Sequence, residues 1–128
     1  LIRHEILKIL AEIISDGRRS ILFSTHITED LDKIADYIVL LNDGRVLLSD
    51  EKDQITAETK KVYLKRDDFH RLPSDLFIAH KMISNECVAV TTKFHELKRA
   101  YKSITGDEPQ AFGMSLDEVM LAYVKGEV

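Results

Sequence analysis

The first hydrophobic pattern along the chain has the spacing of a helix. Apolar residues recur every three or four positions between charged ones, at Ile2, Ile6, Ile9 and Ile13. This spacing predicts an amphipathic helix over residues 2–14. Leu7 and Ile14 widen its apolar stripe, so we expect this helix to be well buried. Gly17 follows the last periodic residue and is the expected C-terminal cap, because glycine tolerates the positive φ of that position.

Shorter elements follow. The apolar run at residues 21–23, which ends in Ser24-Thr25, predicts a strand covered on both faces, as in a parallel sheet. After His26 an acidic helix is expected from about Thr28 to Ala35, with Thr28 as its N-cap. Parallel strands need neighbours, and the sequence offers the 21–25 strand too few of them.

A hairpin and another short helix come next. Residues 37–41 are continuously apolar, and residues 46–48 form a second apolar run. Between them Asn42-Asp43-Gly44-Arg45 is a strong hairpin turn, because Asn, Asp and Gly tolerate the positive φ values that tight turns require. Ser49-Asp50 is expected to open a short helix that runs towards Ile55. This part of the chain therefore has the order helix, strand, helix, strand, hairpin strand, typical of an α/β domain.

The second half has a different pattern. We expect strands at 62–65, 76–83 and 86–92, with a helical turn at 67–72 and an amphipathic helix at 94–104 that ends at Gly106. The β-α-β-β-α order resembles a small ferredoxin-like sandwich. Ser115 and Glu118 form a capping box, which predicts a final helix with an apolar stripe. The fold class is therefore α/β in residues 1–56, followed by an α+β lobe with a C-terminal helix in residues 57–128.

Composition adds limits to this picture. Apolar residues make up 45% of the 128 residues and charged ones 31%, as in a packed globular domain. The 18 Lys and Arg against 22 Asp and Glu argue against a broad nucleic-acid surface. Up to Thr56 the chain holds 7 basic and 11 acidic residues, and the remainder holds 11 of each, which supports a boundary near residues 57–60. The single cysteine, Cys87, cannot form an internal disulfide and fits a reducing compartment.

One segment carries a resemblance to a known family. The run Ile21-Leu22-Phe23-Ser24-Thr25-His26 resembles the H-loop, or switch-histidine loop, of ABC-transporter ATPase domains. There, too, an acidic helix, a segment similar to residues 35–41 and an Asp-Gly-Arg turn follow in the same order. The helix of residues 3–14 is similar to the one after the D-loop in that family. The terminal helix, residues 114–124, looks like that of ATPase subunits serving ABC-2-type exporters.

The resemblance implies a role and a set of partners. His26 would be the switch histidine, the one catalytic and nucleotide-binding residue of this chain, in contact with the γ-phosphate of ATP. In the parent protein ATP and Mg²⁺ would lie between two ATP-binding subunits, and hydrolysis would drive a membrane permease that exports a substrate. The protein would then be cytoplasmic and peripheral on the inner face of the membrane, with no nucleic-acid partner.

Other motifs of that family are missing from the sequence. A Walker A loop needs glycines five positions apart before Lys and Ser or Thr, and no two glycines here have that spacing. A Gly-Gly signature and an acidic Walker B strand are also lacking. We therefore expect a C-terminal fragment of such an ATPase that does not hydrolyse ATP, holds no nucleotide tightly and contains no metal site. Its uncovered apolar edges in residues 1–56 are expected to make it a homo-oligomer.

Each candidate residue also has a simpler explanation. On its spacing alone His26 is an ordinary loop histidine, and the other histidines lack the close pairing that a metal site favours. Cys87 is most simply a small buried hydrophobic residue. A different class of function remains open as well, in which residues 61–106 form a non-enzymatic regulatory module that binds a small ligand or a partner.

Overall fold

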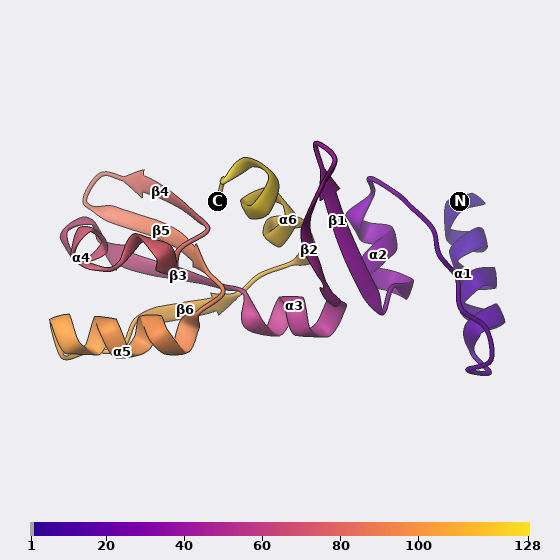
Figure 1. Cartoon of the computed structure of the whole chain (residues 1–128), viewed down its shortest axis with the longest axis horizontal. Coiled ribbons are helices and arrows are strands. Elements are labelled where there is room, and N and C mark those ends of the chain that lie inside the picture. Colours follow the sequence, from indigo (N-terminus) through magenta and orange to yellow (C-terminus); the bar gives the residue numbers. More distant parts are fainter. Residues whose placement is uncertain (1) are drawn as a thin grey trace.

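The computed structural model describes residues 2–128, which form a mixed α/β structure with two antiparallel sheets (Figure 1). The elements of the first part are α1 (Ile2–Ile14), α2 (Thr28–Ile34), β1 (Tyr37–Asn42), β2 (Arg45–Glu51) and α3 (Lys52–Glu58). Those of the second part are β3 (Lys60–Lys65), α4 (Arg66–Arg71), a short 3₁₀ turn (Ser74–Leu76), β4 (Ala79–Ile83), β5 (Glu86–Thr91), α5 (Phe94–Thr105), β6 (Gln110–Gly113) and α6 (Leu116–Lys125).

The hairpin predicted in the first part is confirmed. Strands β1 and β2 pair antiparallel, with Asn42 opposite Arg45 across the turn. Asp43 and Gly44 have φ values of 50° and 74°, the left-handed geometry that favours this residue pair in a two-residue hairpin loop. The two strands form a sheet of their own and do not pair with the four-stranded sheet.

The prediction of a strand at residues 21–25 is wrong. Residues 18–25 form no strand, and Leu22 is fully exposed, at 100% of its accessible surface. A parallel strand needs a hydrogen-bonded neighbour on each side, and the part of the chain that the structure describes provides none at this segment. The apolar run therefore lies extended in the connection between α1 and α2.

Three other expectations need correction. Helix α1 buries only Leu7, whereas its isoleucine stripe stays exposed, so the helix is not well buried. Helix α2 begins at Thr28 itself, with Ile27 in the cap position and no side-chain cap. Ser49 and Asp50 belong to β2, and the following helix begins later, at Lys52. Helix α3 starts where the pairing of β2 with β1 ends, which the local residue preferences did not reveal.

The second part confirms the predicted β-α-β-β-α order and adds a strand, β6, that we did not predict. Its strand order is β4-β5-β3-β6, with every neighbouring pair antiparallel. This β-α-β-β-α-β topology is that of the ferredoxin-like, or split βαβ, motif. Strand β4 begins at Ala79, three residues after the expected start, because residues 74–76 form the 3₁₀ turn. Gly106 ends α5 in the left-handed conformation, as predicted, with φ of 80°.

Two apolar clusters hold the chain together. One lies between the four-stranded sheet and the helices α4 and α5, and its buried members are Val62, Leu64, Leu72, Leu76, Cys87, Ala89 and Leu97. The other joins the two parts through α6, and its buried members are Ile38, Ile55, Ala79, Val90, Met114, Leu116, Val119 and Ala122. Helix α6 accordingly lies between the hairpin and the four-stranded sheet (Figure 1).

Candidate functional site

His26 lies in the connection between α1 and α2, on the surface of the molecule. The backbone N–H of Ile27 donates to Thr25 Oγ1 at 3.0 Å, and the N–H of Asp30 donates to the carbonyl oxygen of Ile27 at 3.2 Å. These bonds shape the turn that leads from His26 into α2. His26 is exposed and lies just before the first turn of that helix.

The elements predicted around His26 are present except for the strand that should precede it. Helix α2 follows with Glu29 and Asp30 in its first turn, and then come β1 and the Asp43-Gly44 turn. In the sequence-based hypothesis, His26 follows the carboxyl end of a strand, and the hydrogen bonds of that strand hold the histidine in place. The described residues supply no such strand, and the loop of His26 leads directly into α2.

Asp30 is the most buried charged residue of the first part. Its side chain is 8% exposed, and Arg3 Nε of α1 lies 3.0 Å from its Oδ1. The pair is close but lacks the alignment of a hydrogen bond, so Oδ1 has no hydrogen-bond partner within the described chain. Arg3 also approaches Glu29, at 4.0 Å, and Lys33 Nζ lies 2.8 Å from His4 Nδ1. Arg3 and His4 of α1 thus make polar contacts with α2.

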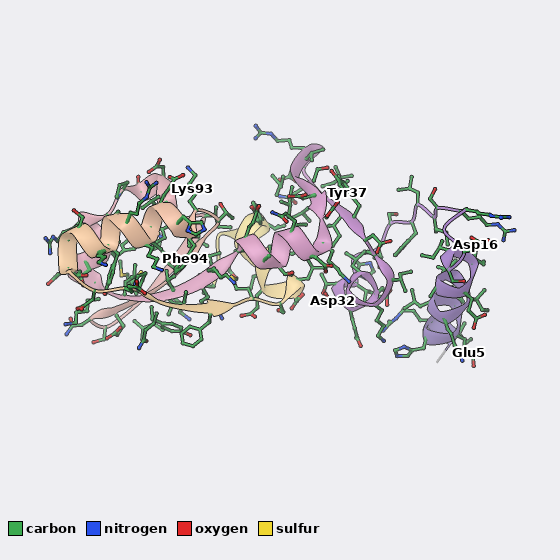
Figure 2. The ribbon with its side chains drawn as sticks, turned by 90° about the horizontal axis from the view of Figure 1, so that it is seen from below. Glu5, Asp16, Asp32, Tyr37, Lys93 and Phe94 are labelled. Carbon is green, nitrogen blue, oxygen red and sulfur yellow. The ribbon has the colours of Figure 1, made fainter. Side chains whose placement is uncertain are left out.

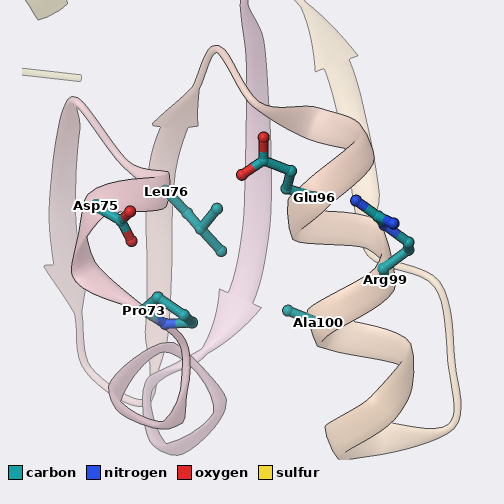
Figure 3. Close-up of a pocket in the computed structure, with 6 residues that line it drawn as sticks. All are labelled: Pro73, Asp75, Leu76, Glu96, Arg99 and Ala100. Atoms are coloured by element: carbon teal, nitrogen blue, oxygen red, sulfur yellow. The ribbon is translucent and has the colours of Figure 1, made fainter.

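The structure brings no further nucleotide-binding group to His26. Across residues 2–128, no set of three or more His, Cys, Asp or Glu side chains is arranged to hold a metal ion. One surface hollow has a volume of about 660 Å³ and lies between the 3₁₀ turn and α5, where Figure 3 shows Asp75, Glu96 and Arg99 as lining residues. The second, about 300 Å³, lies where α2 meets β1 and β2 meets α3. Neither hollow includes His26.

Two contacts that the sequence did not reveal connect the parts of the molecule through α6. Thr28 Oγ1 donates to Asp117 Oδ1 at 3.0 Å, across 89 positions of sequence. Lys61 Nζ donates to Glu118 Oε2, across 57 positions. Neither pair has a local sequence signal, because each depends on how the final helix docks. The capping box of Ser115 and Glu118 is confirmed and was visible in the sequence.

Among residues 2–128, three side chains have shifted pKa values, and all lie in the second part. The hydrogen bond from Lys61, helped by the backbone N–H of Ser115, lowers the pKa of the Glu118 carboxyl. Burial raises the pKa of the Cys87 thiol, and Cys87 is fully buried as predicted. Burial, with a smaller effect from the charge of Glu58, raises the pKa of the Tyr123 phenol. These shifts follow from packing, and none of the three groups contacts His26.

Comparison with known proteins gives no further assignment, since no protein-family model, no curated protein sequence and no solved structure matches the chain significantly. Among the described residues, no helix combines the length and the apolar character that crossing a membrane requires.

Proposed function

We propose that this chain is the C-terminal portion of the ATP-binding subunit of an ABC transporter of the ABC-2 export type. The observation that supports the proposal most directly is the order of elements around His26. An exposed histidine follows Ser24-Thr25, precedes an acidic helix and is followed by a hairpin with an Asp43-Gly44 turn. Each part is common by itself, and their unbroken succession is what favours the proposal.

The uncovered apolar side chains of the first part also support it. Several are half exposed or more, on α1, on the α1–α2 connection and on one side of the hairpin, namely Ile2, Ile6, Ile9, Leu22, Tyr37, Val39, Leu41 and Val46. Exposed apolar patches of this kind mark surfaces that other protein covers. In the proposal, the rest of the ATP-binding domain covers these side chains. When that part of the domain is absent, a second copy of this chain covers them.

His26 would then act as a hydrogen-bond donor to the terminal phosphate of ATP. A neutral imidazole donates from one ring nitrogen and accepts at the other, so it can contact a phosphate oxygen and an attacking water together. This chain supplies neither a phosphate-binding glycine loop nor metal ligands, so its residues alone do not fit ATP and Mg²⁺. In the proposal, a larger protein that includes this chain binds ATP and Mg²⁺. That protein pairs with a second ATP-binding subunit and contacts the permease, on the cytoplasmic side of a membrane.

The test is a substitution in the longer ATP-binding subunit that the proposal requires. His26→Ala should lower kcat for ATP hydrolysis by about 10²–10³, while the affinity for ATP changes little, because the contact strengthens in the transition state. The matched control is His70→Ala, an exposed histidine of α4 in the other part of the molecule. Wild-type turnover in the His26 variant, or an upstream sequence without a Walker A loop, would refute the proposal.

A second candidate function rests on the lobe. Its four-stranded β-α-β-β-α-β sheet and the hollow beside α5 favour a regulatory module that binds a small ligand. The lining combines Arg99 with Asp75 and Glu96, so a small molecule with charges of both signs would fit it best. A thermal-shift screen separates the two functions. Stabilisation by such a metabolite, lost in Arg99→Ala and absent with nucleotides, would favour the module.

A further inference from the structure

Helix α6 contacts both parts of the molecule. Its buried residues Leu116 and Val119 belong to the apolar cluster that contains Ile38 of β1 and Ile55 of α3. Val90 of the four-stranded sheet belongs to the same cluster. The position of α6 therefore depends on the lobe, and the position of the hairpin and of α3 depends on α6 (Figure 1).

Two consecutive carboxylates in the first turn of α6 point to different partners. Asp117 accepts a hydrogen bond from Thr28 of α2, and Glu118 accepts one from Lys61 of β3. The capping box fixes this turn, because Ser115 Oγ accepts from the backbone N–H of Glu118 while the Glu118 side chain accepts from the N–H of Ser115. One rigid helical turn thus joins the lobe to the start of α2.

Thr28 links the first turn of α6 to the loop that contains His26. It is the first residue of α2 and stands two positions after His26. No side chain caps the N-terminus of α2. The hydrogen bond from Thr28 to Asp117 therefore connects the first turn of α2 to α6. Leu31, one turn further on, packs against the apolar cluster that α6 shares. A displacement of α6 would therefore shift the start of α2, and His26 with it.

We infer that α6 is a brace that couples the lobe to the loop of His26, with Asp117 as a positioning residue for that histidine. A ligand or protein that moves the lobe moves α6 through Lys61 and Glu118, and α6 moves α2 through Asp117 and Thr28. The effect on ATP hydrolysis rests on the proposed function. The mechanical coupling itself does not, and it can be measured in this chain alone.

The first experiment follows the His26 ring signals and the backbone amides of residues 25–30 by NMR in the 128-residue chain. Asp117→Ala should shift the His26 ring signals and speed amide exchange in this segment about 2- to 10-fold, the effect of losing one such bond. Asp117→Asn should stay close to wild type, because its side-chain oxygen still accepts. Asp67→Ala is the control, since Asp67 has the same place in the first turn of α4.

Unchanged His26 signals and unchanged exchange in Asp117→Ala, with α6 still helical, would overturn the inference. If that variant does not fold, Thr28→Val and Thr28→Ser decide instead. Valine removes the donor and should reproduce the shift of the His26 signals, whereas serine keeps the donor and should restore them. Equal spectra for the valine and serine variants would also overturn the inference.

The second experiment separates the brace from the proposed function. In the longer ATPase, Asp117→Ala should lower kcat several-fold and leave KM for ATP unchanged, and Asp117→Asn should rescue kcat. If His26→Ala leaves turnover unchanged, the proposed function fails, and the NMR experiment still decides on the brace. If His26→Ala abolishes turnover while Asp117→Ala changes neither kcat nor the His26 signals, the brace alone fails.

Discussion

Two helices with similar sequence patterns differ in how deeply their apolar side chains are buried. Helix α5 places Leu97 and its neighbours on the four-stranded sheet, and Leu97 is fully buried. Helix α1 carries an equally regular stripe, yet Ile9 of that stripe is 54% exposed and only Leu7 is buried. Figure 2 shows the two helices at opposite ends of the molecule, with Phe94 at the start of α5 and Glu5 on α1. An apolar stripe becomes a core only where a second layer of structure covers it.

The same contrast separates the two parts of the chain. Helices α4 and α5 of the lobe cover one face of its sheet, whereas the two-stranded hairpin has a buried residue, Ile38, in a cluster that it shares with α2, α3 and α6. A two-stranded sheet alone is marginally stable in water. The apolar side chains of the first part are therefore less well covered than those of the lobe.

The largest expected effect comes from matched truncations in the two helices. Leu97→Ala removes a fully buried side chain and should lower the free energy of unfolding by about 2–5 kcal/mol. Ile9→Ala removes a side chain that is 54% exposed, and alanine favours helix, so the change should stay within about 0.5 kcal/mol. Urea unfolding followed by circular dichroism measures both. Similar losses for the two variants would show that α1 is covered in solution, by a second copy or otherwise.

A smaller effect is expected at the start of α6. Ser115→Ala removes the side chain that accepts from the N–H of Glu118, and should cost about 1 kcal/mol. Because α6 covers the hairpin, the loss should also speed amide exchange in β1 and β2. Ser103→Ala, at an exposed position inside α5, is the control and should change the stability little. A stability loss that leaves exchange in the hairpin unchanged would show that α6 stabilises the lobe alone.

The smallest effect concerns the ion pair between Lys61 and Glu118. The pKa of Glu118 is lowered from its ordinary value of 4.5, so the folded state favours the charged carboxylate. The contribution is therefore present above pH 4.5 and is lost as the pH falls through the lowered pKa. Because the Glu118 side chain is 42% exposed, solvent screening keeps the contribution below about 1 kcal/mol.

Urea unfolding at pH 7 and at pH 3 tests this contribution. Glu118→Gln should destabilise the chain at pH 7, and its difference from wild type should shrink as the pH falls through the lowered pKa of the Glu118 carboxyl. Glu96→Gln is the control at an exposed position of α5 and should show no such dependence. A difference between wild type and Glu118→Gln that is equal at both pH values would mean that the pair adds nothing to stability.

Local patterns sufficed to predict much of the fold. Helix α5 with Gly106, the Asp43-Gly44 turn and the capping box of Ser115 all depend on residues a few positions apart, and all were predicted. The prediction of a strand at residues 21–25 failed because a strand does not depend on neighbouring residues alone. A strand exists only with a partner, and the apolar run does not reveal whether one is present.

The candidate site divides in the same way. Residue types and their order pointed to His26 as the candidate, but not to how it is held. Its tie to Asp117 through Thr28 spans 89 positions and depends on the docking of α6. The burial of Asp30 also went unpredicted, because an acidic residue in a short helix is ordinarily solvated. Strand β6 was missed because four residues with two polar or glycine positions carry little periodicity.

Native-state hydrogen exchange of the 128-residue chain tests the central claim most directly, namely that the lobe covers its apolar core whereas α1 and the hairpin are only partly covered. The amides of β3, β5 and α5 should exchange only through global unfolding, at the rate set by the full free energy of unfolding. Those of α1 should exchange through local opening, faster by orders of magnitude, and those of the hairpin at an intermediate rate. Equal protection of α1 and α5 in a monomer would contradict the claim, because it would show that the first part closes a core of its own.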